Sequence, residues 1–422
     1  MSTLKVNKLR DTAGSADAIT LDPNGGAVLA GVTTMTTARV TSGIVTNTFI
    51  VGAGVTISES GIEASGIGIT CANINGGAIG GRKNLVINGD MRIAQRATTN
   101  NTAGASSTYK TLDRYMVQIQ SGTLTESQQD LSSSDTPYTL GFRKYMRILN
   151  QSGIGAGAAQ YAEIDQRIEA QDIAQSGWNY TSSSSYITLS FWVRASVAQA
   201  YVAVLYTNDG TQLHYPFEIK DSGGSTLSAD TWTKITKTIP GDSGITISND
   251  NGNGATLSFI AAYGTNYTGG SGAFDVWNTT GGGTTRWPDM TTTWSTTTDA
   301  TFDITGVQLE VGSQATAFEH RSHGEELNLC KRYYQEYENL MQAGQAYQAV
   351  TDGNGLYTPF LFQPEMRATP TITTSDIQDG GSNASVRMSG YANSQKVTLE
   401  VYPTTTNDKI WCYFDVTIDA EL

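Results

Sequence analysis

The stretch Tyr186–Ala195, which reads YITLSFWVRA, shows the pattern that decides the fold of this chain. Apolar side chains alternate with smaller or polar ones, and most of the apolar residues are β-branched or aromatic, which favours strands. Turn-forming residues separate this stretch from others of the same character, with no helical pattern between them. These are Ala200–Tyr206, Trp232–Ile239, Leu257–Tyr263 and Phe302–Glu310. Strands at such spacing predict a β-sandwich over residues 83–322.

The composition of the whole chain agrees with a mainly β protein. Of its 422 residues only 15% are charged and 38% are hydrophobic, while glycine numbers 45 and threonine is commoner still. Threonine favours strands and glycine favours turns, so the composition argues against all-helical proteins and against α/β enzymes built on repeated helices. The net charge of −13 argues against nucleic-acid binding, because phosphate contacts need clustered cations.

Other classes of protein are disfavoured by what the sequence lacks. No run approaches about 18 apolar residues, and Met1–Arg10 lacks the apolar core of a secretory signal, so we expect neither membrane insertion nor a leader. Cys71, Cys330 and Cys412 form no CxxC pair, which suits synthesis in a reducing cytosol. No nucleophile elbow, phosphate loop or marked carboxylate pair is present, so we expect no enzyme, no catalytic residue, no cofactor and no metal ligand set.

Residues 1–82 differ from the rest by a five-residue apolar repeat and by the absence of Trp and Tyr. A period of five fits neither a helix nor one long strand, but it fits short strands and tight turns repeated along an axis. One small apolar residue per repeat cannot close a core within one chain, so we expect an intertwined, oligomeric β shaft. A flexible linker and a single-chain solenoid are the alternatives. The predicted trimer-interface positions are Val40, Val45, Ile50, Val55, Ile57, Ile62, Ile67, Ile69, Ile74 and Ile79.

A helix is predicted over residues 323–340, followed by a terminal β domain over residues 355–422. Acidic residues occupy the first turn of this helix, where the helix dipole favours them. Apolar or aromatic residues then follow a 3-4-3-4 spacing, which is a coiled-coil seam of two heptads. The seam consists of Leu327, Cys330, Tyr334, Tyr337 and Met341. It predicts either a short axial helix in a trimer or a helix packed on its own sandwich.

Several motifs resemble those of a known family. Asn84–Met91 (NLVINGDM) resembles the opening strand of the carbohydrate-binding-module-like jelly rolls of bacteriophage tail proteins, and Leu112–Tyr115 (LDRY) resembles their F-D-R-W motif. Thr305–Ser313 (TGVQLEVGS) and Phe318–Ser322 (FEHRS) together resemble their closing strand. Glu325–Tyr334 resembles the helix that follows this strand in such fibres, and Pro364–Pro370 resembles the M-R-x-x-P signature of their terminal β domain. Leu4–Leu9 resembles the start of structural proteins from marine and cyanobacterial phages.

The resemblance implies a tail fibre of the virion, made in the host cytoplasm and assembled as an elongated homotrimer. Residues 1–82 would attach to other tail or baseplate proteins, residues 83–322 would form the jelly roll, and residues 323–422 would form the helix and terminal β domain. The implied function is adsorption to host polysaccharide or lipopolysaccharide by multivalent binding. No sugar-binding residue is transferred by the motifs. A purely structural tail component and a polysaccharide depolymerase are the alternative functions.

Candidate glycan contacts come from the irregular, Trp-rich segment 263–299. Sugar recognition needs flat apolar rings for stacking, and amides or carboxylates for hydroxyl groups. The predicted contacts are Tyr263, Tyr267, Asp275, Trp277, Asn278, Arg286, Trp287, Asp289 and Trp294. The tryptophans of this segment could instead staple a long loop or fill a subunit interface. Trp192 and Trp232 lie in alternating strands and are expected in the core, and Asn249–Gly254 is expected to be a turn, with a structural calcium ion as the alternative.

Overall fold

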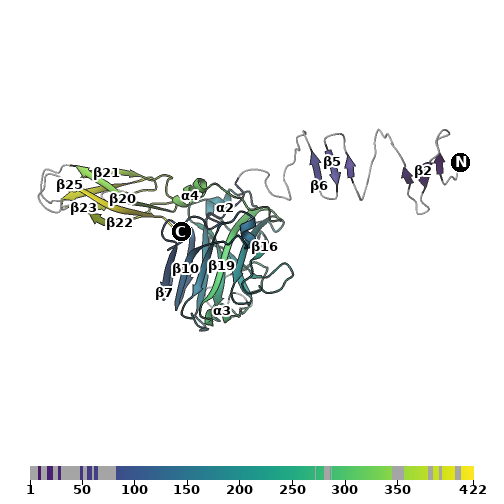
Figure 1. The fold of residues 1–422 in the computed structure, drawn as a ribbon, viewed down its shortest axis with the longest axis horizontal. Helices are drawn as coiled ribbons and strands as arrows, with labels where there is room; N and C mark the ends of the chain where they lie inside the picture. The colour runs from purple at the N-terminus through teal and green to yellow at the C-terminus, as the bar shows by residue number, and fades with distance from the viewer. Residues whose placement is uncertain are drawn as a thin grey trace. The chain divides into compact units, whose positions relative to one another are not determined.

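The computed structural model describes residues 82–270, 272–279, 286, 288–344, 356–378, 384–388, 392–403 and 410–422, together with six short strands before residue 65. The chain divides into two compact units, Met1–Cys71 and Ala72–Leu422. Figure 1 draws the helices and strands as ribbons. Strands make up most of the regular structure, so the prediction of a mainly β protein is confirmed.

The first unit contains two small antiparallel sheets. The first comprises β1 (Lys8–Arg10), β2 (Asp17–Leu21) and β3 (Ala27–Leu29), and the second comprises β4 (Thr48–Ile50), β5 (Val55–Ser58) and β6 (Gly61–Ala64). Four positions of the apolar repeat, Ile50, Val55, Ile57 and Ile62, lie in the second sheet. Val40, Val45, Ile67, Ile69, Ile74 and Ile79 lie outside the described residues. Association of chains at these positions stays a prediction.

Two antiparallel sheets form a β-sandwich in the second unit. The six-stranded sheet has the order β16-β13-β19-β11-β10-β7, and the seven-stranded sheet has the order β18-β15-β14-β17-β12-β9-β8. The first is built from β7 (Thr99–Ala103), β10 (Thr123–Asp130), β11 (Lys144–Asn150), β13 (Tyr186–Ala195), β16 (Thr233–Pro240) and β19 (Ala300–Val311). The second is built from β8 (Ser106–Thr108), β9 (Tyr115–Ile119), β12 (Tyr161–Glu169), β14 (Tyr201–Thr207), β15 (Leu213–Ile219), β17 (Asn253–Tyr263) and β18 (Asn278–Thr279). Short helices between the strands are α1 (Thr136–Thr139), α2 (Ala170–Ala174) and α3 (Thr293–Thr296).

One large hydrophobic core fills the space between the two sheets. The rings of Phe191 in β13 and Phe259 in β17 meet across it edge to face, with centroids 4.9 Å apart. Burying each such side chain stabilises the fold by about 1.5–3 kcal/mol. The expectation that Trp232 is a core residue is confirmed, although it is buried in a separate small cluster with Leu131, Phe142 and Tyr145. The same expectation for Trp192 is wrong: it is only partly buried and packs against that cluster, because alternation along β13 directs it to the outer face of the six-stranded sheet.

The segment Asn84–Met91 does not form the regular strand that its resemblance predicts. Side-chain hydrogen bonds, rather than a regular ladder of backbone hydrogen bonds, satisfy many backbone polar groups of this segment and of the neighbouring strand β19. The Asn84 side-chain oxygen accepts from the N–H of Leu309 at 3.0 Å, and both Asn88 and Met91 adopt a backbone φ of 60°. A strand cannot continue through two residues in the left-handed region, so the segment is an irregular stretch of chain that runs beside β19.

Helix α4 spans only His323–Lys331, so the predicted helix over residues 323–340 is wrong in its second half. A capping box opens it: the Ser322 hydroxyl accepts from the Glu325 N–H at 3.2 Å, and the Glu325 carboxylate accepts from the Ser322 N–H at 2.9 Å. The chain then enters β20 (Tyr334–Gly344), which pairs with β25 (Ile410–Asp419). Tyrosine favours strands, and a partner strand from the far end of the chain decides the structure here.

The predicted helical seam therefore does not exist. Leu327 and Cys330 lie on α4, whereas Tyr334, Tyr337 and Met341 lie on β20, so the 3-4-3-4 spacing does not place them on one helix face. Cys330 and Tyr334 are buried within their own chain. A single helical seam therefore cannot form the trimer contact, while contacts through Leu327, Tyr337 or Met341 and trimer formation itself stay predictions.

The terminal part of the chain forms the expected β domain. One sheet has the order β20-β25-β22, and the other has the order β21-β24-β23. The remaining strands are β21 (Leu356–Leu361), β22 (Thr371–Gln378), β23 (Ala384–Met388) and β24 (Lys396–Pro403). A small hydrophobic core that includes Phe362, Val397 and Phe414 holds the two sheets together.

A buried charged cluster, which we call the junction, joins this terminal domain to the sandwich. It comprises Arg96, Arg114, Tyr333, Tyr334 and Glu421. The guanidinium of Arg114 is fully buried, lies 3.5 Å from the centre of the Tyr333 ring and pairs with the Glu421 carboxylate. The guanidinium of Arg96 lies 3.7 Å from the centre of the Tyr334 ring and 3.3 Å from Glu421. The arginine of the LDRY motif therefore serves the attachment of the terminal domain.

Candidate functional site

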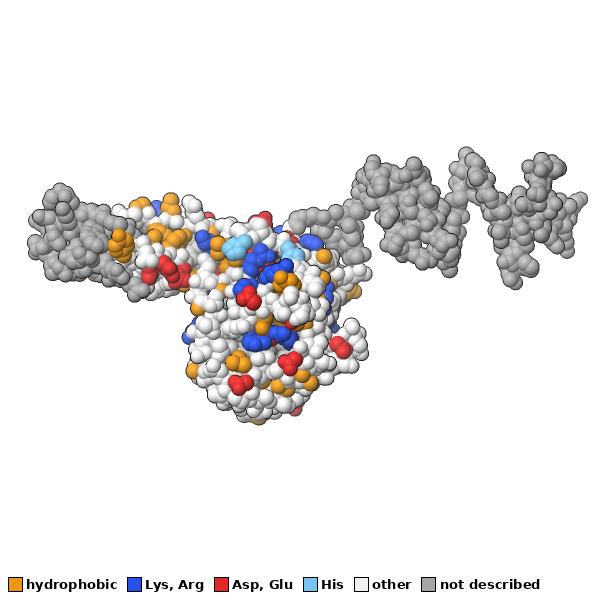
Figure 2. Space-filling view, in the orientation of Figure 1, with side chains coloured by type: hydrophobic (Ala, Val, Ile, Leu, Met, Phe, Trp, Pro, Cys, Tyr) orange, Lys and Arg blue, Asp and Glu red, His pale blue; other side chains and the backbone are white. Residues whose placement is uncertain are grey.

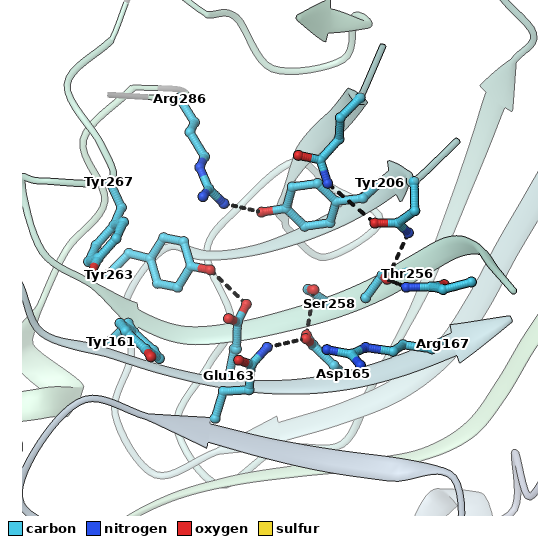
Figure 3. Close-up of a pocket in the computed structure, with 14 residues that line it drawn as sticks. Tyr161, Glu163, Asp165, Arg167, Tyr206, Thr256, Ser258, Tyr263, Tyr267 and Arg286 are labelled. Carbon is cyan, nitrogen blue, oxygen red and sulfur yellow. Dashed lines mark hydrogen bonds between the residues drawn. The ribbon is translucent and has the colours of Figure 1, made fainter. Parts of the chain in front are cut away.

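A groove of about 340 Å³ opens on the outer face of the seven-stranded sheet. Figure 3 shows its lining, with three tyrosine rings gathered at one end and Arg167 and Thr256 at the other. We call it the tyrosine groove. Its lining residues are Gln118, Tyr161, Glu163, Asp165, Arg167, Tyr206, Asn208, Gln212, Asn253, Thr256, Ser258, Tyr263, Tyr267 and Arg286.

Alternation along β12 supplies the floor of the groove. Successive side chains in a strand point to opposite faces of the sheet. Ala162 and Ile164 face the core between the sheets, so Glu163 and Asp165 face the groove, with Tyr161 before them. The sequence Tyr161–Arg167 (YAEIDQR) therefore gives one apolar face and one face of a tyrosine, two carboxyls and an arginine.

An extra residue in β17 turns Tyr263 into the groove. Its pairing register with β12 shifts between Ile260 and Ala262, so one residue of β17 has no opposite number. Before the shift, Leu257 and Phe259 face the core. With simple alternation, Tyr263 would also face the core. The bulge reverses the alternation, so Tyr263 faces outward and forms part of the groove wall.

The three tyrosines form a continuous wall. The ring centroids of Tyr161 and Tyr267 lie 5.5 Å apart with planes at 89°, and those of Tyr263 and Tyr267 lie 5.3 Å apart. Tyr263 is only 4% exposed and supports the other two, which are half-buried. Tyr161 and Tyr267 thus present ring surface to the groove, held in place by ring contacts that disfavour other rotamers.

Two buried carboxyls occupy the floor. The Tyr263 hydroxyl donates to Glu163 Oε2 at 2.7 Å, while the Ser258 hydroxyl and the Gln118 amide donate to Asp165, each at 2.5 Å. Burial raises the pKa of Asp165 from 3.8 to about 6, against the effect of its hydrogen bonds. Burial, and then the charge of Asp165, raise the pKa of Glu163 well above its ordinary value. The floor therefore changes between hydrogen-bond donor and acceptor in weakly acidic solution.

These raised pKa values predict that the two carboxyls destabilise the fold as the pH rises. Both groups bind their protons more tightly in the folded than in the unfolded chain, so their stabilising contribution decreases as the pH rises. The contribution of Asp165 is complete below about pH 4 and is lost as the pH rises through about 6. Relative to Asp165→Asn, the wild type should lose on the order of 1–3 kcal/mol across this range. Urea unfolding of both proteins at several pH values measures this difference, and a flat difference would contradict the prediction.

Polar side chains on the opposite side complete the groove. Arg286 Nη1 donates to the Tyr206 hydroxyl at 3.2 Å. The amides of Asn208 and Asn253 both donate to the Thr256 hydroxyl at 3.0 Å. Within the described part of the chain, Asn253 Oδ1 and Arg286 Nε are buried without a hydrogen-bond partner. A buried polar atom without a partner is costly, so the hydrogen bonding of this side of the groove is incomplete.

Of the predicted glycan contacts, the structure brings Tyr263, Tyr267 and Arg286 into one site. Trp287 lies outside the described residues. Trp294 is fully buried in the core, so its assignment as a glycan contact is wrong: a ring without exposed surface cannot stack on a sugar. Its segment forms α3, and the irregular composition around it hid a core position.

The other predicted contacts lie outside the groove and have structural partners. Asp275 pairs with Lys237 at 2.5 Å, and Asp289 accepts from the Thr268 hydroxyl at 2.8 Å. The side chain of Asn278 closes a turn onto Ala273 and Val276, while Trp277 packs against the core and donates to the Pro240 carbonyl at 2.7 Å. None of these four residues lines the tyrosine groove.

Sequence reasoning missed the β12 residues, which supply Tyr161, Glu163, Asp165 and Arg167. Their alternating pattern was available, but a polar face on a strand reads as an ordinary solvated surface. Only the tyrosine at its start distinguishes it.

The described residues hold no group of three or more His, Cys, Asp or Glu side chains that could bind a metal. In the loop Asn249–Gly254, Asp250 Oδ1 accepts from the Gly252 N–H at 2.9 Å, which is the geometry of the expected turn. Over the same described parts of the chain, no helix has the length and apolar character needed to cross a bilayer.

No family model and no curated protein matches the chain. Similar solved structures include tailspike protein 4 of bacteriophage CBA120, at 10% identity and a TM-score of 0.25, over 54% of this chain and 21% of that one. A putative sugar-binding protein from Bacteroides thetaiotaomicron is 14% identical, with a TM-score of 0.27, over 54% of this chain and 99% of that one. A family 11 carbohydrate-binding module of a Clostridium thermocellum cellulase is 11% identical, with a TM-score of 0.25, over 52% and 100% of the two chains. Likeness at this level carries neither ligand nor activity over to this chain.

Proposed function

We propose that the tyrosine groove binds a glycan, and that the chain is a virion tail fibre that attaches to host polysaccharide or lipopolysaccharide through it. One observation carries the glycan proposal: a wall of half-exposed tyrosine rings stands beside a floor of carboxyl, amide, hydroxyl and guanidinium groups. A sugar ring offers matching chemistry, with apolar C–H faces and a rim of hydroxyl groups. The groove volume of about 340 Å³ also falls in the range of about 300–1,000 Å³ that is usual for small-ligand sites.

The tail-fibre role is supported by the sequence motifs rather than by the groove. Three of these motifs contribute contacts that hold the fold together. Asn84 accepts from the Leu309 N–H beside β19, Arg114 pairs with Glu421 in the junction, and Glu325 caps α4. The motifs therefore resemble the family in residues that stabilise its fold. In a homotrimer, three grooves of low affinity per fibre, on several fibres per virion, would raise the effective concentration of each site without any new contact. Residues 1–82 would supply the attachment to other tail or baseplate proteins.

We also propose that the groove binds without cleaving. Glycoside cleavage needs one carboxyl on each side of the scissile bond. Glu163 and Asp165 lie side by side on one strand at the floor, and Tyr263, Ser258 and Gln118 hold their oxygens (Figure 3). The two raised pKa values nevertheless make a depolymerase the second candidate, since a protonated carboxyl is the usual general acid.

Removing either half-exposed tyrosine is expected to weaken glycan binding. In the full chain, Tyr161→Ala and Tyr267→Ala should each reduce affinity about two- to tenfold, the value of one ring contact. A glycan array identifies the ligand, and calorimetry on that glycan measures the affinities. Tyr186→Ala, which removes a tyrosine that is 37% exposed and lies outside the groove, should bind as the wild type does.

The outcomes separate the three candidate functions. Loss of binding in the groove variants alone supports the proposal. No binding to any array glycan or to host cells would favour a purely structural tail component. Release of oligosaccharides from host polysaccharide by the wild type, with none released by Glu163→Gln, would establish a depolymerase.

A further inference from the structure

A second cavity, of about 250 Å³, lies on the outer face of the six-stranded sheet. We call it the tryptophan pocket. It is on the other sheet from the tyrosine groove and shares no lining residue with it. Trp192 and Lys234 come from neighbouring strands β13 and β16, and Phe142, Phe318 and His320 come from the segments that cross over this face.

Ring contacts fix the walls of this pocket. The centroids of Phe142 and Phe318 lie 4.8 Å apart with planes at 69°, and His320 contacts both rings at 5.1 and 4.9 Å. His320 Nε2 lies 2.9 Å from the carbonyl oxygen of Leu140, so that nitrogen carries the proton and donates. The imidazole is therefore held in one orientation, although it is exposed to solvent.

A bulge at Gly306 creates the space for the tryptophan pocket. Between Ser190 and Trp192 of β13, the partner strand β19 contains one extra residue, and Gly306 there has a φ of 63°. A Cβ at this position would lie 2.8 Å from Phe142 Cζ and 3.2 Å from Trp192 Cδ1. Only glycine allows the two rings to stand this close to the backbone, so the cavity is a built feature of the strand pair.

The lining of the pocket contains one cation, Lys234, and neither Asp nor Glu, although the chain carries a net charge of −13. Figure 2 shows Lys and Arg side chains gathered on this face of the sandwich. Outside the pocket lining, Arg147 and Arg194 share the carboxylate of Asp303, at 2.8 and 2.9 Å, and Arg194 also pairs with Asp135 at 3.4 Å. The ammonium of Lys234 is exposed, and no ion pair to it occurs among the described residues. An unpaired cation beside a partly exposed indole ring suits a ligand with one negative charge and one apolar face.

We propose that the tryptophan pocket binds a carboxylate-bearing sugar unit of an acidic polysaccharide. The C–H face of the sugar stacks on Trp192, and its carboxylate accepts from the Lys234 ammonium. Hydroxyl groups of the sugar then donate to the Thr316 oxygen, whose own proton goes to Glu310 at 2.7 Å, and to Nδ1 of His320 at the rim. A neutral sugar leaves Lys234 unpaired, and a phosphate group without a ring leaves the aromatic walls unused. The site is independent of the proposed function of the tyrosine groove.

The test compares sugar acids with their neutral counterparts on the full chain. Ligand-observed NMR with glucuronate and galacturonate should detect binding, and glucose and galactose should give at least tenfold weaker binding, the value of a charge-assisted hydrogen bond. Lys234→Gln keeps most of the side chain, lies on the surface and should lower glucuronate affinity by about tenfold. Lys237→Gln, on the opposite face of the same strand, and Tyr267→Ala should leave it unchanged.

Each outcome decides the proposal. Equal binding of glucose and glucuronate, unchanged affinity in Lys234→Gln, or binding of benzoate in place of glucuronate would overturn it. Loss of glucuronate binding in Tyr267→Ala would move the sugar acid to the tyrosine groove and also overturn it. If Trp192→Ala keeps the circular dichroism spectrum of the wild type and loses glucuronate binding, the stacking role of the ring is supported; unchanged binding would contradict that role.

Discussion

Replacing Arg114 by methionine should lower the free energy of unfolding by about 3–5 kcal/mol, because it removes one of the two guanidinium partners of the buried Glu421 carboxylate. The guanidinium of Arg114 is fully buried; it pairs with Glu421, donates to the carbonyl oxygen of Arg167 at 2.5 Å and lies over the Tyr333 ring. Methionine fills much of the volume but satisfies none of these groups. Urea unfolding followed by tryptophan fluorescence measures the change.

A matched surface variant and a double variant sharpen this test. Arg143→Met removes an exposed arginine that also lies over a tyrosine ring, 3.9 Å from its centre, and should cost no more than about 0.5 kcal/mol. Adding Glu421→Gln to Arg114→Met removes the buried carboxylate charge that Arg96 alone would then balance, and should recover part of the loss. A cost below about 1 kcal/mol for Arg114→Met alone would show that the junction contributes little.

Replacing Trp294 by alanine should cost about 3–5 kcal/mol of folding stability and leave glycan affinity at the tyrosine groove unchanged. The indole is fully buried in the core beneath α3. The Asn150 amide holds that helix by donating to the carbonyl oxygens of Trp294 and Ser295, both at 3.0 Å. The cost therefore arises from a cavity, and Trp294 does not line the tyrosine groove.

Denaturant unfolding and calorimetry on the same preparation separate the two roles of Trp294. Tyr161→Ala provides the reverse pattern, with weakened binding and little loss of stability. If Trp294→Ala kept its stability and lost its ligand, the indole would be a contact after all, and its burial in the core would be contradicted.

Strand positions in the sandwich could be predicted because alternation is a local property. The stretch Tyr186–Ala195 became β13 with the same ends, and the strands predicted over Ala200–Tyr206 and Trp232–Ile239 became β14 and β16. Helix α4 began where its acidic first turn indicated, but its end depended on pairing between β20 and β25, whose sequences are far apart. No local pattern reveals such a partner.

The candidate site was only partly predictable, for two physical reasons. The bulge in β17 interrupts the alternation of inward-facing and outward-facing side chains. The orientation of Tyr263 therefore does not follow from its position after Leu257 and Phe259. The polar face of β12 has the composition of a solvated surface, and only the fold brings it beside Tyr267 and Arg286. Tryptophan content was a poor guide, since Trp294 serves the core.

The junction also has a mechanical consequence. Arg114 alone joins three separate places in the chain: the carbonyl oxygen of Arg167 in β12, the Tyr333 ring beyond α4, and the carboxylate of Glu421. A load applied to the terminal strands would therefore act on these contacts as well as on the connecting peptide. The contact with Arg167 would carry part of that load to β12, the strand that contains Glu163 and Asp165.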